Sequence, residues 1–368
     1  MTPQAWLRRT RAGLTVAGLI AIGLIATGLP GVPANAAKRT VDRVIKDSRI
    51  TESSGLAPSL RHPGVLWTHN DSGNPPLIYS IEKSGSTAST LRLVGEPNID
   101  WEAISSFRGP AGSIAAGQAL IAIGDIGDNN AVRASVRIAI VREPAELRSA
   151  TVRPIRVLRV RYPGGPRDAE TLLSDPHTGQ LYIVSKTLFG SALYSVPLSI
   201  WPGGGSGTSK LTTLTRVASM TASFITDGVF LPNGRILLRG YDRVSVIEPP
   251  AAVHSGRLTT LASSMLPDQD QGESIALVDG GVRALIGSEG RREPVLRITV
   301  PTVDSDRSGA TATLPGSTGS RSAAGSSATH PAGFAGVADL RIWVGVIGAA
   351  FILVALTFMG LLLRSRRN

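Results

Sequence analysis

The feature that most constrains the fold of this chain is a unit of short apolar runs that recurs five times between residues 37 and 302. Each unit begins with an acid-bearing start, such as Asp-Trp-Glu at 100–102 or Asp-Ala-Glu at 168–170. Further apolar runs follow, separated by turn residues such as Asn-Gly at 233–234. Helical periodicity is nearly absent, so the repeat predicts a set of four-stranded units.

Repeated four-stranded units are typical of a β-propeller, in which each unit forms one blade. The fifth unit lacks its fourth strand, and an apolar run at 40–45 is left over at the front. We therefore predict an all-β propeller of five four-stranded blades, closed by the N-terminal strand. A sixth blade, hidden near 110–118 or Arg133, and a β-sandwich are the alternatives. A sandwich gives no reason for an acid at the same place in every unit.

The N-terminal 36 residues have the order of a secretory signal peptide. Three arginines lie within residues 1–11, an almost wholly apolar stretch covers 13–29, and Ala-Asn-Ala at 34–36 matches a signal-peptidase site. Cleavage is expected after Ala36, which assigns residues 37–302 to the propeller. An uncleaved N-terminal anchor is the alternative.

The C-terminal part of the sequence predicts a membrane anchor. Residues 303–340 are rich in Ser, Gly, Ala and Thr, which is typical of a flexible linker. Residues 341–363 form a predicted transmembrane helix whose apolar part reaches about 33 Å, enough for a bilayer core of roughly 30 Å. The basic tail at 364–368 is expected to stay cytoplasmic. The sequence thus predicts a single-pass protein of the cell membrane with an extracytoplasmic propeller.

Charge and cysteine content exclude two classes of function. The chain has a net charge of +11, but seven of its 38 basic residues lie in the predicted signal peptide or beside the predicted anchor. The rest of the chain has 31 basic and 27 acidic residues, an ordinary balance. The net charge therefore gives no argument for nucleic-acid binding. There is no cysteine, which excludes disulfides and thiolate chemistry.

Acidic residues recur at two places in the units. One set lies at the start of the first strand: Glu52, Asp100, Glu102, Asp168, Glu170, Asp227 and Glu273. The other set follows the second strand: Asp71, Asp125, Asp128 and Glu289. Because both connections lie on the same face of a propeller, these acids are predicted to converge on one rim. The ligand-binding candidates beside them are Asn70, Lys186, Arg239 and Arg133.

A ring of carboxylates is costly unless something offsets the repulsion between like charges. Ca²⁺ takes six to eight oxygen ligands and would do so, whereas a set without cysteine disfavours zinc. We therefore predict a divalent-cation site, with Ca²⁺ as the suspected ion, formed by these eleven acids. The alternative for each acid is a structural role, in which its carboxylate binds backbone amides of a neighbouring blade.

Six motifs of this chain resemble a family of bacterial exported propellers called "esterase-like activity of phytase". They are Ser-Gly-Leu-Ala at 54–57, Asn-Asp-Ser-Gly at 70–73, Asp-Trp-Glu at 100–102, Gly-Asp-Ile-Gly-Asp-Asn at 124–129, Asp-Ala-Glu at 168–170 and Gly-Glu-Ser-Ile at 272–275. The resemblance covers most of residues 50–300. It implies a phytase-like propeller that depends on calcium and hydrolyses phosphoesters.

Two classes of function stay open. The first is a metal-dependent hydrolase of phosphoesters or related esters, in which cations polarise the ester and activate water. The second is a non-catalytic propeller that binds a small molecule or a cell-envelope polymer. Phosphate hydrolysis requires Lys186, Arg239 and Arg133 to converge on the acids, whereas arginines that point away favour binding. No catalytic residue can be assigned from the sequence.

Overall fold

A computed structural model describes residues 40–201, 207–250 and 256–303. All of them belong to one of the two units into which the chain divides, Met1–Thr311. The predicted signal peptide, the predicted transmembrane segment 341–363 and the linker beyond Val303 lie outside the described residues. Within the described ranges, no helix is long and apolar enough to cross a membrane.

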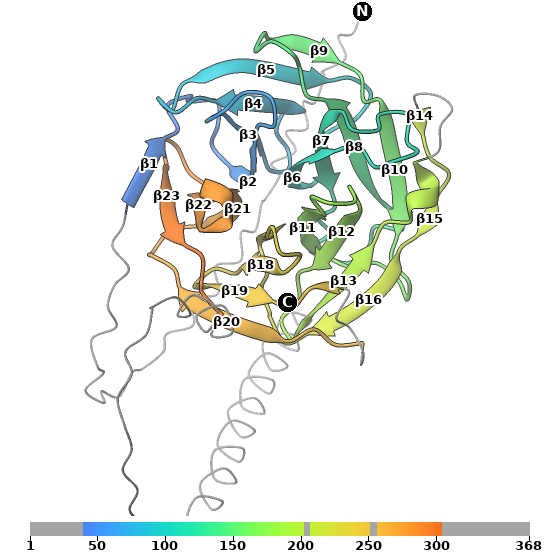
Figure 1. The fold of residues 1–368 in the computed structure, drawn as a ribbon. Coiled ribbons are helices and arrows are strands. Elements are labelled where there is room, and N and C mark those ends of the chain that lie inside the picture. The colour runs from blue at the N-terminus through green and yellow to red at the C-terminus, as the bar shows by residue number, and fades with distance from the viewer. Residues whose placement is uncertain (1–39, 202–206, 251–255, 304–368) are drawn as a thin grey trace, which may run out of the picture. The chain divides into compact units, whose positions relative to one another are not determined.

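Five sheets surround a central axis and form a five-bladed β-propeller (Figure 1). Blade 1 contains β2 (Ser53–Pro58), β3 (Leu66–Asn70), β4 (Leu77–Ile81) and β5 (Thr87–Leu93). Blade 2 contains β6 (Trp101–Arg108), β7 (Ala119–Asp125), β8 (Val136–Arg142) and β10 (Arg156–Arg161). Blade 3 contains β11 (Ala169–Ser174), β12 (Leu181–Ser185), β13 (Ser191–Ser195) and β16 (Thr215–Met220). Blade 4 contains β17 (Asp227–Phe230), β18 (Ile236–Arg239), β19 (Arg243–Ile247) and β20 (Thr260–Met265). Blade 5 contains β21 (Gly272–Val278), β22 (Arg283–Ser288), β23 (Pro294–Thr299) and β1 (Thr40–Val44). Within the described ranges, two short 3₁₀ turns, Leu198–Ile200 and Asp279–Gly281, lie in the connections.

The N-terminal strand closes the ring, as predicted. Strand β1 pairs antiparallel with β23, with Thr40 opposite Arg297, and so supplies the fourth strand of blade 5. Residues 110–118 form turns and isolated bridges rather than a sixth blade, and one of these bridges joins Gly109 to Ala116. The prediction of five blades is therefore confirmed, and the sandwich alternative is wrong.

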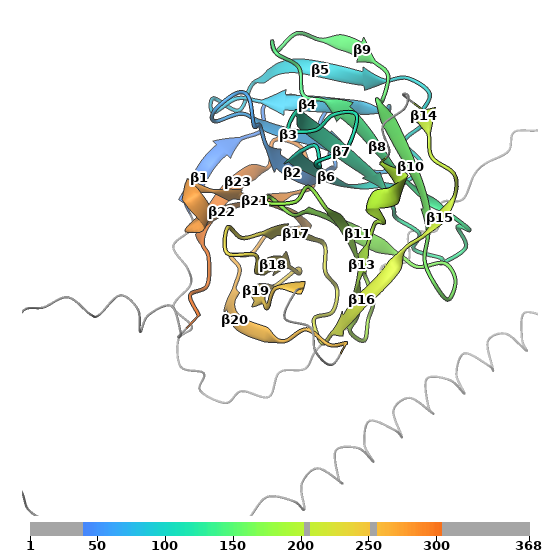
Figure 2. The same cartoon turned by 45° about the vertical axis from the view of Figure 1, so that its right-hand side comes forward.

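Short parallel strands tie the outer strands of neighbouring blades together, which the sequence did not predict. Before the outer strand of blade 2, β9 (Ala150–Val152) pairs with β5 of blade 1, and β10 pairs with β8 within blade 2. Before the outer strand of blade 3, β14 (Gly207–Thr208) and β15 (Thr212–Thr213) pair in the same way with β10 of blade 2. Figure 2 shows β9 outside β5. These additions cover edges that would otherwise expose backbone donors and acceptors.

The hydrophobic core lies between adjacent blades rather than at the central axis. One cluster joins blades 2 and 3 through side chains such as Leu120, Ile140, Leu172 and Tyr194, all nearly inaccessible to solvent. Similar clusters lie at the other blade interfaces. This packing leaves the starts of the inner strands β2, β6, β11, β17 and β21 at the axis, free to carry polar groups.

Candidate functional site

Four of the five described inner strands begin with a β-bulge at one end of the axis. In their pairing with the second strand the register skips one residue, and the skipped residues occupy the same place in each blade: Ser54, Glu102, Glu170 and Glu273. A bulge bends the strand and re-aims a side chain. Blade 4 has no bulge at this end, because Asp227 pairs with Arg239 in a regular ladder. In three of the five blades the recurring acid of the sequence is thus the bulge residue.

Asp71, Asp100 and Glu102 form a compact group on this face. One carboxylate oxygen of each residue lies within 4.8 Å of the others. Two oxygens that both bind one Ca²⁺ at about 2.4 Å can be no more than roughly 4.8 Å apart. The three carboxylates therefore fit the spacing that a single hard cation requires.

Glu170 lies next to this group and carries an unsatisfied oxygen. Its Oε1 accepts a hydrogen bond from the ammonium of Lys186, which also donates to the hydroxyl of Tyr241 at 2.9 Å. Its Oε2 is buried and has no hydrogen-bond partner among the described residues. Because buried polar atoms are nearly always satisfied, this oxygen indicates a place for a proton or a ligand.

The acids of this face hold protons more tightly than ordinary carboxyls. Burial, followed by the like charge of Asp71, raises the pKa of Asp100 to about 6. Burial, followed by the charge of Glu170, raises the pKa of Glu102 to about 11. Burial also raises the pKa of Glu170 to about 8, although Lys186 acts in the opposite direction. At neutral pH the group therefore retains protons that a divalent cation would displace.

Two of the predicted ligands connect blades through backbone amides. Asp227 accepts hydrogen bonds from the backbone N–H of Gly228 at 2.7 Å and of Ile275 at 2.8 Å, which joins blade 4 to blade 5. Asp168 accepts one from the N–H of Asp128 at 2.8 Å, which joins blade 3 to blade 2. These contacts are the structural role that the sequence left as an alternative for each acid.

Asp125 and Asp128 shape the loop that follows β7. Asp128 accepts hydrogen bonds from the backbone N–H groups of Val132 and Arg133 at 2.9 and 2.8 Å. Asp125 accepts one from the backbone of Asp100 at 3.1 Å and one from the guanidinium of Arg133 at 2.7 Å. Arg133 is thereby held by its own loop, and its charge lowers the pKa of Asp100 against the effect of burial.

Arg239 is fully buried between blades 4 and 5. Its guanidinium donates to the backbone oxygens of Ser274 at 2.6 Å and Gly287 at 2.7 Å, and to the side chain of Gln269 at 2.7 Å. Of the three predicted basic residues, only Lys186 therefore contacts an acid of the compact group or its neighbour Glu170. The convergence that a phosphate site requires is not formed.

Asn70 and Glu52 form hydrogen bonds within the loops next to the start of β2, the inner strand of blade 1. The side-chain oxygen of Asn70 accepts hydrogen bonds from the backbone of Thr51 at 3.1 Å and Glu52 at 3.2 Å. The carboxylate of Glu52 accepts one from the side chain of Asn74. Asn70 thus positions the loop and is not directed at a ligand.

The remaining two acids, Glu273 and Glu289, both belong to blade 5, near its junction with blade 1. Glu289 accepts a hydrogen bond from Ser54 at 2.7 Å, and burial raises its pKa to about 7. Glu273 is buried as well, and its pKa is raised by burial against the opposing effect of Lys186. Both belong to the same acidic face as the compact group.

The sequence did not single out Tyr241, which contacts Lys186. This tyrosine lies in the connection between β18 and β19, the place that holds Lys186 in blade 3 and Asp71 in blade 1. That shared position was the signal available in the sequence.

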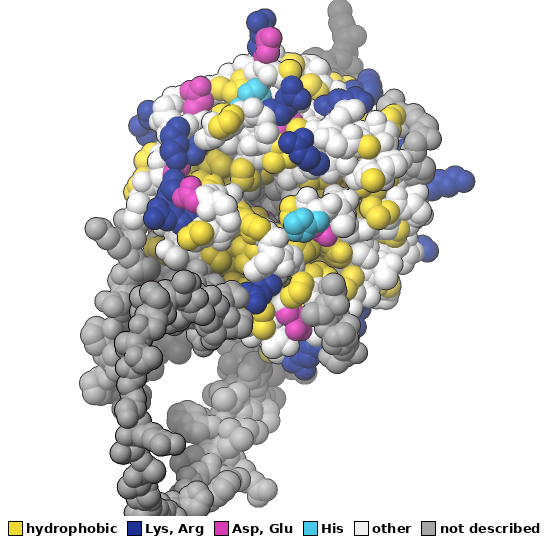
Figure 3. All heavy atoms as spheres, in the orientation of Figure 1, with side chains coloured by type: hydrophobic (Ala, Val, Ile, Leu, Met, Phe, Trp, Pro, Cys, Tyr) yellow, Lys and Arg dark blue, Asp and Glu magenta, His cyan; other side chains and the backbone are white. Residues whose placement is uncertain are grey.

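The two ends of the axis differ in character. Exposed hydrophobic side chains lie in the loops around the acidic end: Ile99, Val132, Leu188, Phe189, Phe224 and Tyr241. At the opposite end the inner strands line a small cavity of about 150 Å³ with residues such as Leu56, Ile104 and Phe230. Figure 3 shows that opposite face, where hydrophobic side chains surround a central hollow. The acids predicted as ligands therefore gather at the other end, away from this hollow.

The raised pKa values predict that the cation-free protein loses stability as the pH rises. In the unfolded chain the pKa values of these carboxyls are near 3.8 for Asp and 4.5 for Glu. In the folded state they are raised to about 6 to 8, so at pH values between the two sets the folded state binds more protons than the unfolded chain. Unfolding then releases protons, and each one lowers the free energy of unfolding by about 1.4 kcal/mol per pH unit.

We expect the melting temperature in chelator to fall steadily from pH 5 to pH 8, as followed by circular dichroism. Glu170→Gln should flatten this slope, and Glu82→Gln, an exposed acid outside the group, should leave it unchanged. A melting temperature that rises from pH 5 to pH 8 would contradict the raised pKa values of these acids.

Comparison with known proteins does not assign this chain to a family. No family model matches the sequence, and no curated protein matches it. A chain of a mitotic checkpoint complex is similar at 13% identity and a TM-score of 0.33, over 67% of this chain and 61% of that one. The chain thus spans less than two thirds of that protein's length.

Two further solved structures are similar over almost their whole length. Glutaminyl cyclase from Myxococcus xanthus has 11% identity and a TM-score of 0.37, over 72% of this chain and 99% of that one. An oxidoreductase described as a glucose dehydrogenase, from a Thermus species, has 13% identity and a TM-score of 0.35, over 69% and 99%. At these scores the likenesses give no indication of function.

Proposed function

We propose that the acidic end of the propeller binds a divalent cation, with Ca²⁺ as the best fit, and through it an oxygen-rich ligand. The observation that carries the proposal is the compact group of Asp71, Asp100 and Glu102, whose oxygens have the spacing of ligands of one ion. The donors are all oxygens, which suits a hard cation. The bound ion would polarise an oxygen of the ligand.

Binding is favoured over hydrolysis of phosphomonoesters because of the two arginines. Arg133 is paired with Asp125, and Arg239 is buried in backbone contacts, so neither can hold a phosphate at the acid group. The exposed hydrophobic side chains around the acidic end suit a ligand with apolar parts, such as a small molecule or a cell-envelope polymer.

Hydrolysis of a different ester is a second candidate, which Lys186 and Tyr241 favour. Their ammonium and hydroxyl groups lie in hydrogen-bond contact beside Glu170, and such groups can transfer protons to a reacting ligand. The resemblance to phytase-like exported propellers supports both the ion and this chemistry. From the sequence we also propose that the propeller is extracytoplasmic and anchored by residues 341–363.

Calcium titration of the purified full-length chain tests the cation site. With a dissociation constant near 10⁻⁴–10⁻³ M, millimolar Ca²⁺ stabilises by about 1 kcal/mol, which raises the melting temperature by roughly 2–4 °C. Asp71→Asn combined with Asp100→Asn should abolish the shift without unfolding the protein, and Glu82→Gln should retain it.

If the melting temperature of the wild type does not change when Ca²⁺ is added at pH 7.5, the proposed cation site is contradicted. Binding and hydrolysis are distinguished by assaying the same samples with nitrophenyl esters of acetate and of phosphate, each with and without Ca²⁺. Calcium-dependent turnover of the acetate ester alone supports the second candidate. Turnover of neither ester, together with the thermal shift, supports binding.

A further inference from the structure

A cavity of about 420 Å³ lies on blade 3, beside the loops of the acidic end but away from the axis. It is formed by the segment before β11, the connection between β12 and β13, and parts of β13 and β16. Arg167, Tyr194 and Arg216 are among the residues that line it, and none of the described residues around it is acidic. The cavity shares no residue with the compact group of the proposed cation site.

The strand register places Tyr194 and Arg216 on the face of blade 3 that is turned to blade 2. Tyr194 lies opposite Ile183 of β12 and opposite Arg216 of β16. Tyr194 and Ile183 belong to the hydrophobic cluster between blades 2 and 3, which also contains Tyr162, the residue after β10. Because directly opposite residues of antiparallel strands share a face, Arg216 lies on this side of the blade too. The cavity therefore opens beside the junction of blades 2 and 3.

Three polar groups at this junction are buried without a partner. They are the hydroxyls of Tyr162 and Tyr194 and the Nε of Arg167, none of which has a hydrogen-bond partner among the described residues. The side chains of the two tyrosines are 5% and 0% exposed, and their rings pack edge to face with centroids 5.1 Å apart. Buried polar groups are nearly always satisfied, so unpartnered donors that lie close together indicate a place for a ligand.

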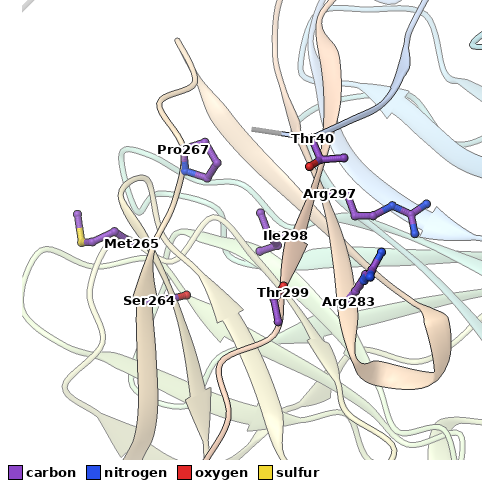
Figure 4. Close-up of a pocket in the computed structure, with 8 residues that line it drawn as sticks. All are labelled: Thr40, Ser264, Met265, Pro267, Arg283, Arg297, Ile298 and Thr299. Atoms are coloured by element: carbon purple, nitrogen blue, oxygen red, sulfur yellow. The ribbon is translucent and has the colours of Figure 1, made fainter. Parts of the chain in front are cut away.

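Two arginines give this cavity a positive charge that nothing offsets. The side chains of Arg167 and Arg216 form no hydrogen bond or ion pair with another described residue. Figure 4 shows a cavity of the same volume between blades 4 and 5, which also has two arginines in its lining. There Arg297 is paired with Asp42 and Asp279, and no lining residue has a buried polar atom without a partner. The two cavities therefore differ in the charge that they offer to a ligand.

Apolar side chains complete the lining of the cavity on blade 3. Leu188 and Phe189, in the connection between β12 and β13, are 56% and 90% exposed, and Ala192 lies in the wall. Binding sites for small molecules combine apolar walls with a few polar groups that fix the orientation of the ligand. A ligand that suits this cavity therefore has an apolar body beside its anionic group.

We propose that this cavity binds an oxyanion, a carboxylate or phosphate group carried on an apolar body. The guanidinium of Arg167 pairs with the anion, and the hydroxyls of Tyr194 and Tyr162 supply neutral donors. Burial raises the pKa of Tyr162, so its hydroxyl keeps its proton at neutral pH and can donate to an anion. The proposal does not rest on the cation site, and the binding needs no Ca²⁺.

Isothermal titration calorimetry of the full-length chain in chelator tests the proposal with three probes. Benzoate and phenyl phosphate carry the two anions on the same ring, and benzyl alcohol is the neutral probe. We expect at least one anion to bind, and benzyl alcohol to bind about tenfold more weakly or not at all, since a hydrogen bond to a charged group contributes about that factor. Tighter binding of benzoate identifies a carboxylate ligand, and tighter binding of phenyl phosphate identifies a phosphate.

Two variants of the cavity and one control locate the binding. Arg167→Gln should weaken binding of the anion about tenfold or more, and Tyr194→Phe, which removes only the hydroxyl, should weaken it severalfold. Arg283→Gln, in the cavity of Figure 4, should bind like the wild type. The melting temperature of each variant shows whether it is folded.

Three results would overturn the proposal. The first is that neither anion binds, or that benzyl alcohol binds as tightly as the anions. The second is that folded Arg167→Gln binds the anion like the wild type. The third is that the anion binds only after Ca²⁺ is added, because this would place it at the acidic group instead.

Discussion

A chain that lacks residues 40–47 is expected to lose the cooperative unfolding transition of the propeller. The deletion removes β1 and leaves the backbone groups of β23 at an open edge. It also removes Ile45, which is buried against Leu56 and Val295 in the core between blades 5 and 1. The deletion also removes the carboxylate of Asp42, which is almost inaccessible to solvent. This takes away the ion-pair partner of Lys83 and one of the two ion-pair partners of Arg297, which keeps Asp279.

Thermal unfolding followed by circular dichroism and by tryptophan fluorescence measures this effect. The deletion should give a broad transition or none, whereas Val41→Ala, which changes an exposed side chain of the same strand, should melt like the wild type. If the deletion variant keeps the wild-type melting temperature and a sharp transition, closure by β1 contributes nothing to stability and the closure argument fails.

Arg239→Met is expected to destabilise the folded propeller by about 3–5 kcal/mol. The substitution leaves the oxygens of Ser274, Gly287 and Gln269 without their donor in a buried interface. Each buried acceptor that loses its partner costs about 1–3 kcal/mol, and these costs add to the lost packing of a fully buried side chain. Arg239→Lys should recover only part of the loss, since one ammonium cannot reach three acceptors in the same way.

Denaturant unfolding of the variant, compared with Arg243→Met, measures this loss. Arg243 lies on the neighbouring strand but is exposed. Its ion pair with Asp242 beside it and its long contact with the sulfur of Met265 are both at the surface, so its replacement should cost less than about 1 kcal/mol. A loss below 1 kcal/mol for Arg239→Met would show that the arginine does not hold blades 4 and 5 together.

The fold was predictable because its evidence is local and repeated. Apolar runs and turns recur five times, and the strand left over at 40–45 had one open place to fill. The parallel strands between blades were not predictable, because β9 and β15 contain only three and two residues and look like loop in the sequence. Their pairing depends on a neighbouring edge that only the assembled ring provides.

The candidate site was predictable in position but not in detail. The sequence placed the acids on one face, but it predicted both Asp227 and Asp100 as cation ligands and gave no way to distinguish their roles. The partner of Asp227 is the backbone of Ile275, 48 residues away, and no local pattern reveals it. The bulge that re-aims Glu102 is likewise a property of the pairing between β6 and β7. Tertiary hydrogen bonds therefore decide which acids remain for a ligand.

The pairing of β1 with β23 also has a consequence for the order of folding. Blades 1 to 4 are built mainly from strands that follow one another in the chain, so each can form from local hairpins as it is synthesised. The last blade instead joins residues more than 250 positions apart, Thr40 and Arg297, and β1 has to wait for β23. At about 5–20 residues per second, that wait lasts on the order of tens of seconds. Strand β1 carries the charged residues Asp42 and Arg43, and charged side chains oppose pairing between the edges of strands. The folding rate is therefore expected to be set by this single long-range contact.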